Sequence, residues 1–186
     1  MKIIEEQLSL DLNRVNFIFK NEEIITECLK NHGGFSLLGE QYGPFEKGNK
    51  YKLKYFLALP FIQNDVLKLS SSEKCDNIDV QRYAISERDD QKLTHQLNIY
   101  FLNRIKEFKH FMEIEVKRNH RPKVDLDRYN SYTTNIIDSR LLKLLRLSKA
   151  ELSLDDEKRL SYPEKLLYRR LFAIIKAWRV FFLSIN

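Results

Sequence analysis

The residue types that most often do chemistry are few in this chain, and their spacing matches no metal or acid/base site. Four histidines are dispersed along it: His32, His95, His110 and His120. None stands at metal-ligand spacing from another histidine or from a cysteine. The acidic runs Asp89-Asp90 and Asp155-Asp156-Glu157 stand at expected helix starts, where carboxylates favour the positive end of the helix dipole. The pattern therefore predicts no metal, no cofactor and no catalytic pair.

Glycine suggests one other chemistry, a phosphate-binding loop, because all five glycines lie between Gly33 and Gly48. Such a loop needs a Gly-Lys-Ser/Thr ending that opens a helix, or a GxGxxG pattern, and the chain has neither. Clustered glycines also supply the positive φ that sharp turns need. The sequence thus predicts turns between short strands, and we interpret the protein as non-enzymatic.

Positive charge is the remaining chemical feature. The formal net charge is +6, and the whole excess falls in residues 76–186. It is densest in one basic loop, which supplies the candidate nucleic-acid contacts Lys117, Arg118, Arg121 and Lys123. Aromatic residues for base stacking are missing around this loop, so it predicts weak contact with a DNA backbone at most. An ordinary solvated helix surface explains the same charge equally well.

The two cysteines, Cys28 and Cys75, are far apart and lack CxxC spacing, which fits reduced thiols in an intracellular protein. The first residues become acidic by Glu5 and lack the apolar region of a signal peptide. We therefore expect a cytoplasmic protein.

Residues 1–75 predict a small, mostly β domain. Residues 3–14 fit a strand or a helical face, whereas the aromatic and β-branched segment 15–20 favours a strand. Further strands are expected at 24–29, 35–38, 50–54 and 66–69. Residues 55–62 are apolar on every side, so we expect them to be buried, and Pro60 limits any helix there to about two turns. The serine-rich segment 70–74 is the best candidate for a linker.

Residues 76–186 predict an α-helical domain, so the fold class is α+β: a small β domain followed by an all-α helical bundle. Apolar residues that include Leu93, Leu97 and Phe101 recur every three or four positions and indicate one long helix from 89 to 116. A second helix is expected over 126–150, and a short third one after Ser153. Ser161 and Glu164 form a capping box that opens the last helix.

The last helix is apolar almost all round, because only Lys176, Arg179 and Ser184 are polar between Leu171 and Ile185. Such a helix is expected to be buried on nearly all sides, and it is too short and too charged to span a bilayer. About 110 residues can hardly wrap it completely, so part of its surface is expected to meet another subunit. The alternative is the central helix of a self-contained bundle.

The order of elements and two motifs resemble a family. The motifs are the segment 38–45, Leu-Gly-Glu-Gln-Tyr-Gly-Pro-Phe, with Gly48 after it, and the segment 55–59, Tyr-Phe-Leu-Ala-Leu. Together they resemble a GINS subunit of the class that places its β domain first, which contains the second and third Psf subunits. The composition resembles an archaeal member. The family usually has a proline just before the aromatic of the second motif, where this chain has Lys54.

The resemblance implies a non-catalytic, nucleoid-associated scaffold in DNA replication that joins the MCM helicase to a RecJ-like or Cdc-type protein. It implies pairing with a second GINS subunit of swapped domain order in a two-plus-two heterotetramer, with primase as a further partner. The candidate subunit contacts, each of which could also be core, are Phe101, Phe108, Trp178, Phe181 and Phe182. The alternative from another class is a free-standing basic DNA-binding protein.

Overall fold

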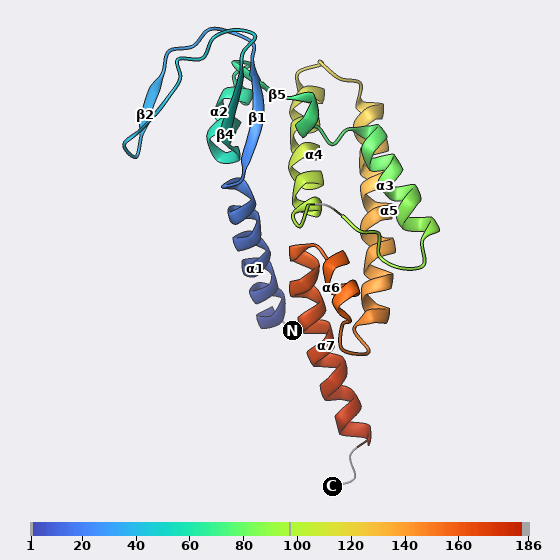
Figure 1. Ribbon diagram of the computed structural model, residues 1–186. Coiled ribbons are helices and arrows are strands. Elements are labelled where there is room, and N and C mark those ends of the chain that lie inside the picture. The colour runs from blue at the N-terminus through green and yellow to red at the C-terminus, as the bar shows by residue number, and fades with distance from the viewer. Residues whose placement is uncertain (1, 97, 184–186) are drawn as a thin grey trace. The chain divides into compact units, whose positions relative to one another are not determined.

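The computed structural model describes residues 2–96 and 98–183 of the chain, which form a mixed α and β protein (Figure 1). A small antiparallel sheet lies near the N-terminus in sequence and helices follow it, as the sequence predicted. The chain divides into two compact units, one of Asn16–Lys74 and one of Met1–Val15 with Cys75–Asn186. Residues 1–15, which the sequence analysis assigned to the β domain, therefore group with the helical unit.

The sheet of the small unit has three strands in the order β4-β1-β5, and a separate hairpin pairs β2 with β3. The strands are β1 (Glu23–Cys28), β2 (Phe35–Leu37), β3 (Glu40–Tyr42), β4 (Lys50–Lys54) and β5 (Leu67–Leu69). All pairs are antiparallel, and Ile24 of β1 stands opposite Leu53 of β4. Alternate β1 residues are buried, as the period of a half-buried strand requires. The four predicted segments 24–29, 35–38, 50–54 and 66–69 are confirmed as β1, β2, β4 and β5, whereas β3 was not predicted.

A short helix, α2 (Tyr55–Gln63), follows β4 directly and packs against all three strands of the sheet (Figure 1). Leu57 and Ala58 are buried, whereas Phe56 is partly exposed, so the expected burial of this segment holds for one side of the helix. Phe61 stacks on Phe35 with a centroid distance of 5.3 Å and thereby ties the hairpin to α2. The apolar motif is therefore a packing element of the small unit.

The first helix corrects one prediction. Residues 15–20 do not form a strand, because α1 runs over Lys2–Lys20. Val15 and Phe19 stand four residues apart and are both buried, while Phe17 and Ile18 are exposed. The ring of Phe19 packs on Tyr55 at 5.4 Å. Burial on one helical face has overridden the β preference of the aromatic and branched residues.

The turn of the β2-β3 hairpin places an apolar residue in an unfavourable position. Leu38 and Gly39 both have positive φ, 52° and 83°, and the Leu38 side chain is 94% exposed. Two positive φ values define the tight hairpin turn that prefers Asn-Gly. Leucine in this conformation is strained, whereas asparagine tolerates it.

Replacing Leu38 with Asn is therefore expected to stabilise the protein by about 0.5–1 kcal/mol. Urea unfolding measures this, with the change in midpoint as the readout. The matched control is Leu37→Asn, in β2, where no positive φ is relieved and no gain is expected. A Leu38→Asn variant that unfolds at or below the wild-type midpoint would contradict the expectation.

The helical unit contains α3 (Asn77–Asp89), α4 (Phe101–Lys117), α5 (Lys123–Leu147), α6 (Leu154–Arg159) and α7 (Tyr162–Leu183). Both α3 and α4 pack against the long helix α5, and α7 contacts α5 as well (Figure 1). Buried side chains between these helices include Ile105, Met112, Tyr129, Ile136 and Leu144. The predicted second, third and last helices are confirmed within a few residues at each end.

The long helix predicted over 89–116 is wrong. Helix α3 ends at Asp89, residues 90–100 connect it to α4, and α4 begins only at Phe101. Leu93 matched the helical period because it is buried in the core with Leu144, Leu160 and Tyr168, although it lies in the connection. Two other residues of the predicted apolar stripes, Leu97 and Ile185, lie outside the described residues.

Candidate interaction surface

Helix α7 carries the candidate surface, and its first turn is fixed by a predicted cap. The backbone N–H of Ser161 donates to Glu164 Oε2 at 2.8 Å, and the Ser161 hydroxyl donates to the same oxygen at 2.6 Å. Glu164 thus reaches back to the residue before the helix, as a capping box requires. The other carboxylate oxygen of Glu164 is free to bind elsewhere, and it does so in the core.

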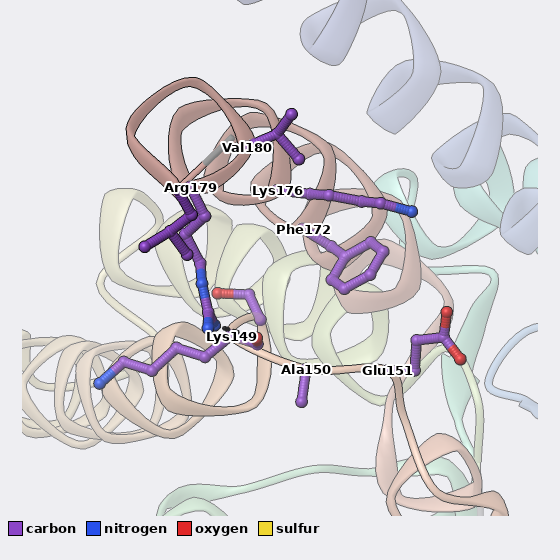
Figure 2. A pocket seen from close by; sticks show the side chains of 9 residues that line it. Lys149, Ala150, Glu151, Phe172, Lys176, Arg179 and Val180 are labelled. Carbon is purple, nitrogen blue, oxygen red and sulfur yellow. Dashed lines mark hydrogen bonds between the residues drawn. The ribbon is translucent and has the colours of Figure 1, made fainter. Parts of the chain in front are cut away.

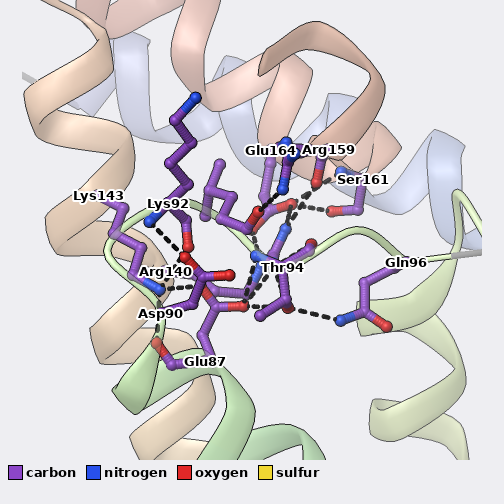
Figure 3. A network of polar contacts seen from close by, with 11 residues as sticks. Glu87, Asp90, Lys92, Thr94, Gln96, Arg140, Lys143, Arg159, Ser161 and Glu164 are labelled. Carbon is purple, nitrogen blue, oxygen red and sulfur yellow. Dashed lines mark hydrogen bonds and ion pairs between the residues drawn. The ribbon is translucent and has the colours of Figure 1, made fainter. Parts of the chain in front are cut away.

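A buried ionic network joins this first turn to α3 and α5 (Figure 3). The guanidinium of Arg140, only 2% exposed, lies between two carboxylates. Its Nε donates to Glu164 Oε1 at 2.6 Å, and its Nη1 donates to Glu87 Oε2 at 2.7 Å. Its Nη2 donates to the carbonyl of Arg159 at 2.9 Å. One side chain of α5 therefore contacts α3, α7 and the last residue of α6.

Lys143 completes the network and holds the connection between α3 and α4. Its ammonium donates to Glu87 Oε1 at 2.5 Å and to the carbonyl of Lys92 at 2.9 Å. Arg140 also donates to the carbonyl of Thr94 at 3.3 Å. With two cations facing two carboxylates, Glu87 and Glu164, the formal charges balance inside the core.

The electrostatic consequences follow from these contacts. Burial alone would raise the pKa of Glu87, but hydrogen bonds from Lys143 and Thr94 and the charge of Arg140 outweigh it and lower that pKa. Burial would likewise lower the pKa of Arg140, but Glu164 and Glu87 raise it. Glu87 and Arg140 are therefore both held in their charged forms by the partners around them, as a structural network requires.

The second half of α7 has the opposite character, because it is apolar and exposed. The exposed fractions of Trp178, Phe181 and Phe182 are 63%, 78% and 63%. Figure 1 shows this part of α7 running on past the end of α5. Within the described residues of the chain alone, this half of the helix is therefore not buried, which contradicts the alternative of a central helix in a self-contained bundle. The expected burial against another subunit stays a prediction.

The apolar residues of this half form one aromatic face. Ile174, Trp178 and Phe181 stand at spacings of four and three residues, which places them on the same side of a helix, and Phe182 lies beside them. The rings of Trp178 and Phe182 are 4.9 Å apart, and those of Phe181 and Phe182 are 5.0 Å apart. We call these four residues the aromatic face. Large contiguous apolar patches of this kind mark interaction sites.

The opposite side of the same half borders a pocket of about 380 Å³ (Figure 2). Its lining comes from α7 and from the segment after α5: Ser148, Lys149, Ala150, Glu151, Phe172, Lys176, Arg179, Val180 and Leu183. Arg179 Nη1 donates to the carbonyl of Lys149 at 3.2 Å, and the ammonium of Lys176 lies 5.9 Å from the centre of the Phe172 ring. We call this hollow the α7 pocket.

The structure separates the five predicted subunit contacts into two groups. Trp178, Phe181 and Phe182 lie exposed on the aromatic face. Phe101 and Phe108 are 5% and 7% exposed, and they pack against Tyr83 and Tyr129 inside the helical unit. These two belong to the core and are not available as surface contacts.

Of the four predicted nucleic-acid contacts in the basic loop, three are exposed and one, Arg121, pairs with carboxylates of the chain. Arg121 Nε donates to Glu115 at 2.7 Å, and its guanidinium also lies 3.9 Å from Asp125. Lys117, Arg118 and Lys123 are exposed at the end of α4 and the start of α5. The neighbouring carboxylates neutralise much of the positive charge of Arg121, so the loop is a weaker phosphate-binding candidate than its sequence indicated.

Sequence reasoning did not identify the Arg140 network or the α7 pocket. A signal for the first was present, since Arg140 interrupts an apolar run between Ile136 and Leu144 on the buried side of α5. Its partner Glu87 stands 53 residues earlier, so only the fold brings the two together. The pocket has no local signature at all, because its two sides come from segments more than 20 residues apart.

Among the described residues no group of histidine, cysteine and acidic side chains could hold a metal ion. Over the same residues, no helix is long and apolar enough to cross a membrane. Compared with known proteins, the chain matches no protein-family model and no curated protein.

Proposed function

We propose that the protein is a non-catalytic scaffold subunit of a GINS complex in DNA replication. In this role its small β unit and a helical bundle domain serve protein contacts, and it joins the MCM helicase to a RecJ-like or Cdc-type protein in the cytoplasm. Primase is a further partner in this proposal. The support from the sequence is the pair of motifs at 38–45 and 55–59, in a chain whose small β unit precedes all of its α-helices except α1 and α2.

The observation that carries the proposal is the aromatic face. Three aromatic rings exposed on one helix end are costly in water, and a partner helix that covers them would recover that cost. A free-standing DNA-binding protein has no need of such a face, and Arg121 of the basic loop is engaged by carboxylates of its own chain. The scaffold reading is therefore favoured over the DNA-binding alternative.

Co-expression with a GINS subunit of swapped domain order from the same genome tests this function. We expect a stable heteromer of two plus two chains by light scattering. Trp178 is the single tryptophan of the chain, so its fluorescence should shift to shorter wavelength when the partner covers it. A chain that stays alone beside this partner, and instead binds DNA tightly with strong salt dependence, would contradict the proposal.

A further inference from the structure

The two sides of the second half of α7 differ in charge as well as in position. The aromatic face contains no charged residue, whereas the α7 pocket has Lys149, Lys176 and Arg179 around it. Residues two apart on a helix are separated by about 200°, so the Phe172 and Ile174 side chains point to nearly opposite sides. One partner surface laid on the aromatic face therefore leaves the pocket side open to a second contact.

The three cations are not neutralised within the described residues. None of Lys149, Lys176 and Arg179 has an ion pair there, although Glu151 lines the same pocket. Arg179 uses one nitrogen on a backbone carbonyl, and a guanidinium has several further donors. The pocket therefore combines an excess of positive charge with unused hydrogen-bond donors.

The floor of the pocket is apolar. Phe172 stacks on Tyr168 at 5.7 Å, and Phe172, Val180 and Leu183 are the apolar residues that α7 contributes to the lining. A volume of about 380 Å³ is enough for one or two large side chains and too small for a whole helix. Phosphate binding needs charge but no apolar floor, whereas a peptide with an apolar anchor and flanking carboxylates uses both features.

We propose that the α7 pocket binds a short acidic segment of a partner protein, which inserts an apolar side chain against Phe172 and Val180. Carboxylates beside that anchor pair with Lys149, Lys176 and Arg179. A second copy of α7 does not fit, because residues 165–183 contain five basic residues and no acidic residue, so two copies would repel each other. The pocket thus adds a contact that is separate from the aromatic face.

Selection of binding peptides tests the proposal with the whole chain as bait and a phage-displayed library of random 16-residue peptides as probe. We expect enriched sequences that combine Asp or Glu with Leu, Phe or Trp. Fluorescence anisotropy with the enriched peptides should show affinity at least tenfold lower for the variant Lys149→Gln/Lys176→Gln/Arg179→Gln. All three side chains are exposed, so the variant should keep the wild-type melting temperature.

The matched control is the variant Trp178→Ala/Phe181→Ala, which alters the aromatic face and should leave peptide affinity unchanged. Enriched peptides without acidic residues, an empty selection, or equal affinity for the glutamine variant would each overturn the proposal. A DNA oligonucleotide that competes with the peptides through the same three cations would also overturn it, in favour of a phosphate site. The peptide experiment can be interpreted even if the heteromer experiment fails, because it uses the chain alone without a GINS partner.

Discussion

Replacing Arg140 with Met should destabilise the protein by about 3–5 kcal/mol. The substitution removes the guanidinium and leaves the carboxylates of Glu87 and Glu164 buried in the same core. Glu87 would keep Lys143 and Glu164 would keep Ser161, but the charge balance of the network would change from neutral to negative. An uncompensated buried charge costs far more than the pair contributes, so the loss should exceed that of an ordinary core substitution.

Urea unfolding followed by circular dichroism measures this loss. The matched control is Arg146→Met on the same helix, since Arg146 is exposed and its replacement should change the free energy of unfolding by no more than about 0.5 kcal/mol. Combining Arg140→Met with Glu164→Gln should recover part of the loss, because Glu164, the carboxylate that is left without a cation, is then replaced by a neutral amide. A single variant within about 1 kcal/mol of wild type would show that water or rearrangement compensates the charges.

The largest effect on association is expected from the aromatic face. In a chain that forms the proposed heteromer, the variant Trp178→Ala/Phe181→Ala/Phe182→Ala should weaken the complex by at least about 100-fold, since buried aromatic anchors contribute about 2 kcal/mol or more each. The free chain should lose little stability, because the three rings are exposed and touch mainly one another. Analytical ultracentrifugation of the co-expressed chains measures the dissociation.

A control on other exposed apolar residues separates a specific interface from general stickiness. Ile78 and Leu154 are 67% and 80% exposed on α3 and α6, and the variant Ile78→Ala/Leu154→Ala should leave the complex intact. Loss of the complex in both variants would mean that association depends on exposed apolar surface in general and not on the aromatic face. Retention in both would remove the aromatic face as the interface.

The sequence predicted those elements that depend on residues close to one another in the chain. The strands β1 and β4 follow the alternation of apolar residues, and the reach of Glu164 back to Ser161 follows from a four-residue motif. Helix α1 was partly misread because short aromatic runs fit both periods, and only the contact of Phe19 with Tyr55 decides between them. The two residues are 36 positions apart, so no pattern within residues 15–20 indicates that they are in contact.

The break between α3 and α4 was missed for a related reason. Leu93 stands at helical spacing although it lies in the connection between α3 and α4, because a residue of a connection can also be buried in the core. What holds the connection is a set of backbone carbonyls, those of Lys92, Leu93 and Thr94, which accept hydrogen bonds from Lys143, Arg159 and Arg140. Every residue has a backbone carbonyl, so the sequence does not indicate which carbonyls accept these hydrogen bonds.

For the candidate site too, the sequence predicted the local property and not the one that depends on the fold. The apolar character of the last helix was evident, but its exposure was not, since a helix that is apolar all round predicts burial until the number of neighbouring helices is known. Phe101 and Phe108 have the same residue type as Phe181 and the opposite environment. Residue type alone could not separate core from surface among these aromatics.

The pairing of Asp11 in α1 with Arg170 in α7, at 2.5 Å, has a consequence for biosynthesis. The two residues are 159 positions apart, and a ribosome adds about 5–20 residues per second, so Asp11 emerges roughly 8–30 s before Arg170 is made. During that interval Asp11 lacks its ion-pair partner on α7, whereas residues 16–74, which form the other compact unit, have all been made. The two ends of the helical unit can therefore join only when translation is nearly complete, so this unit is completed after the small unit.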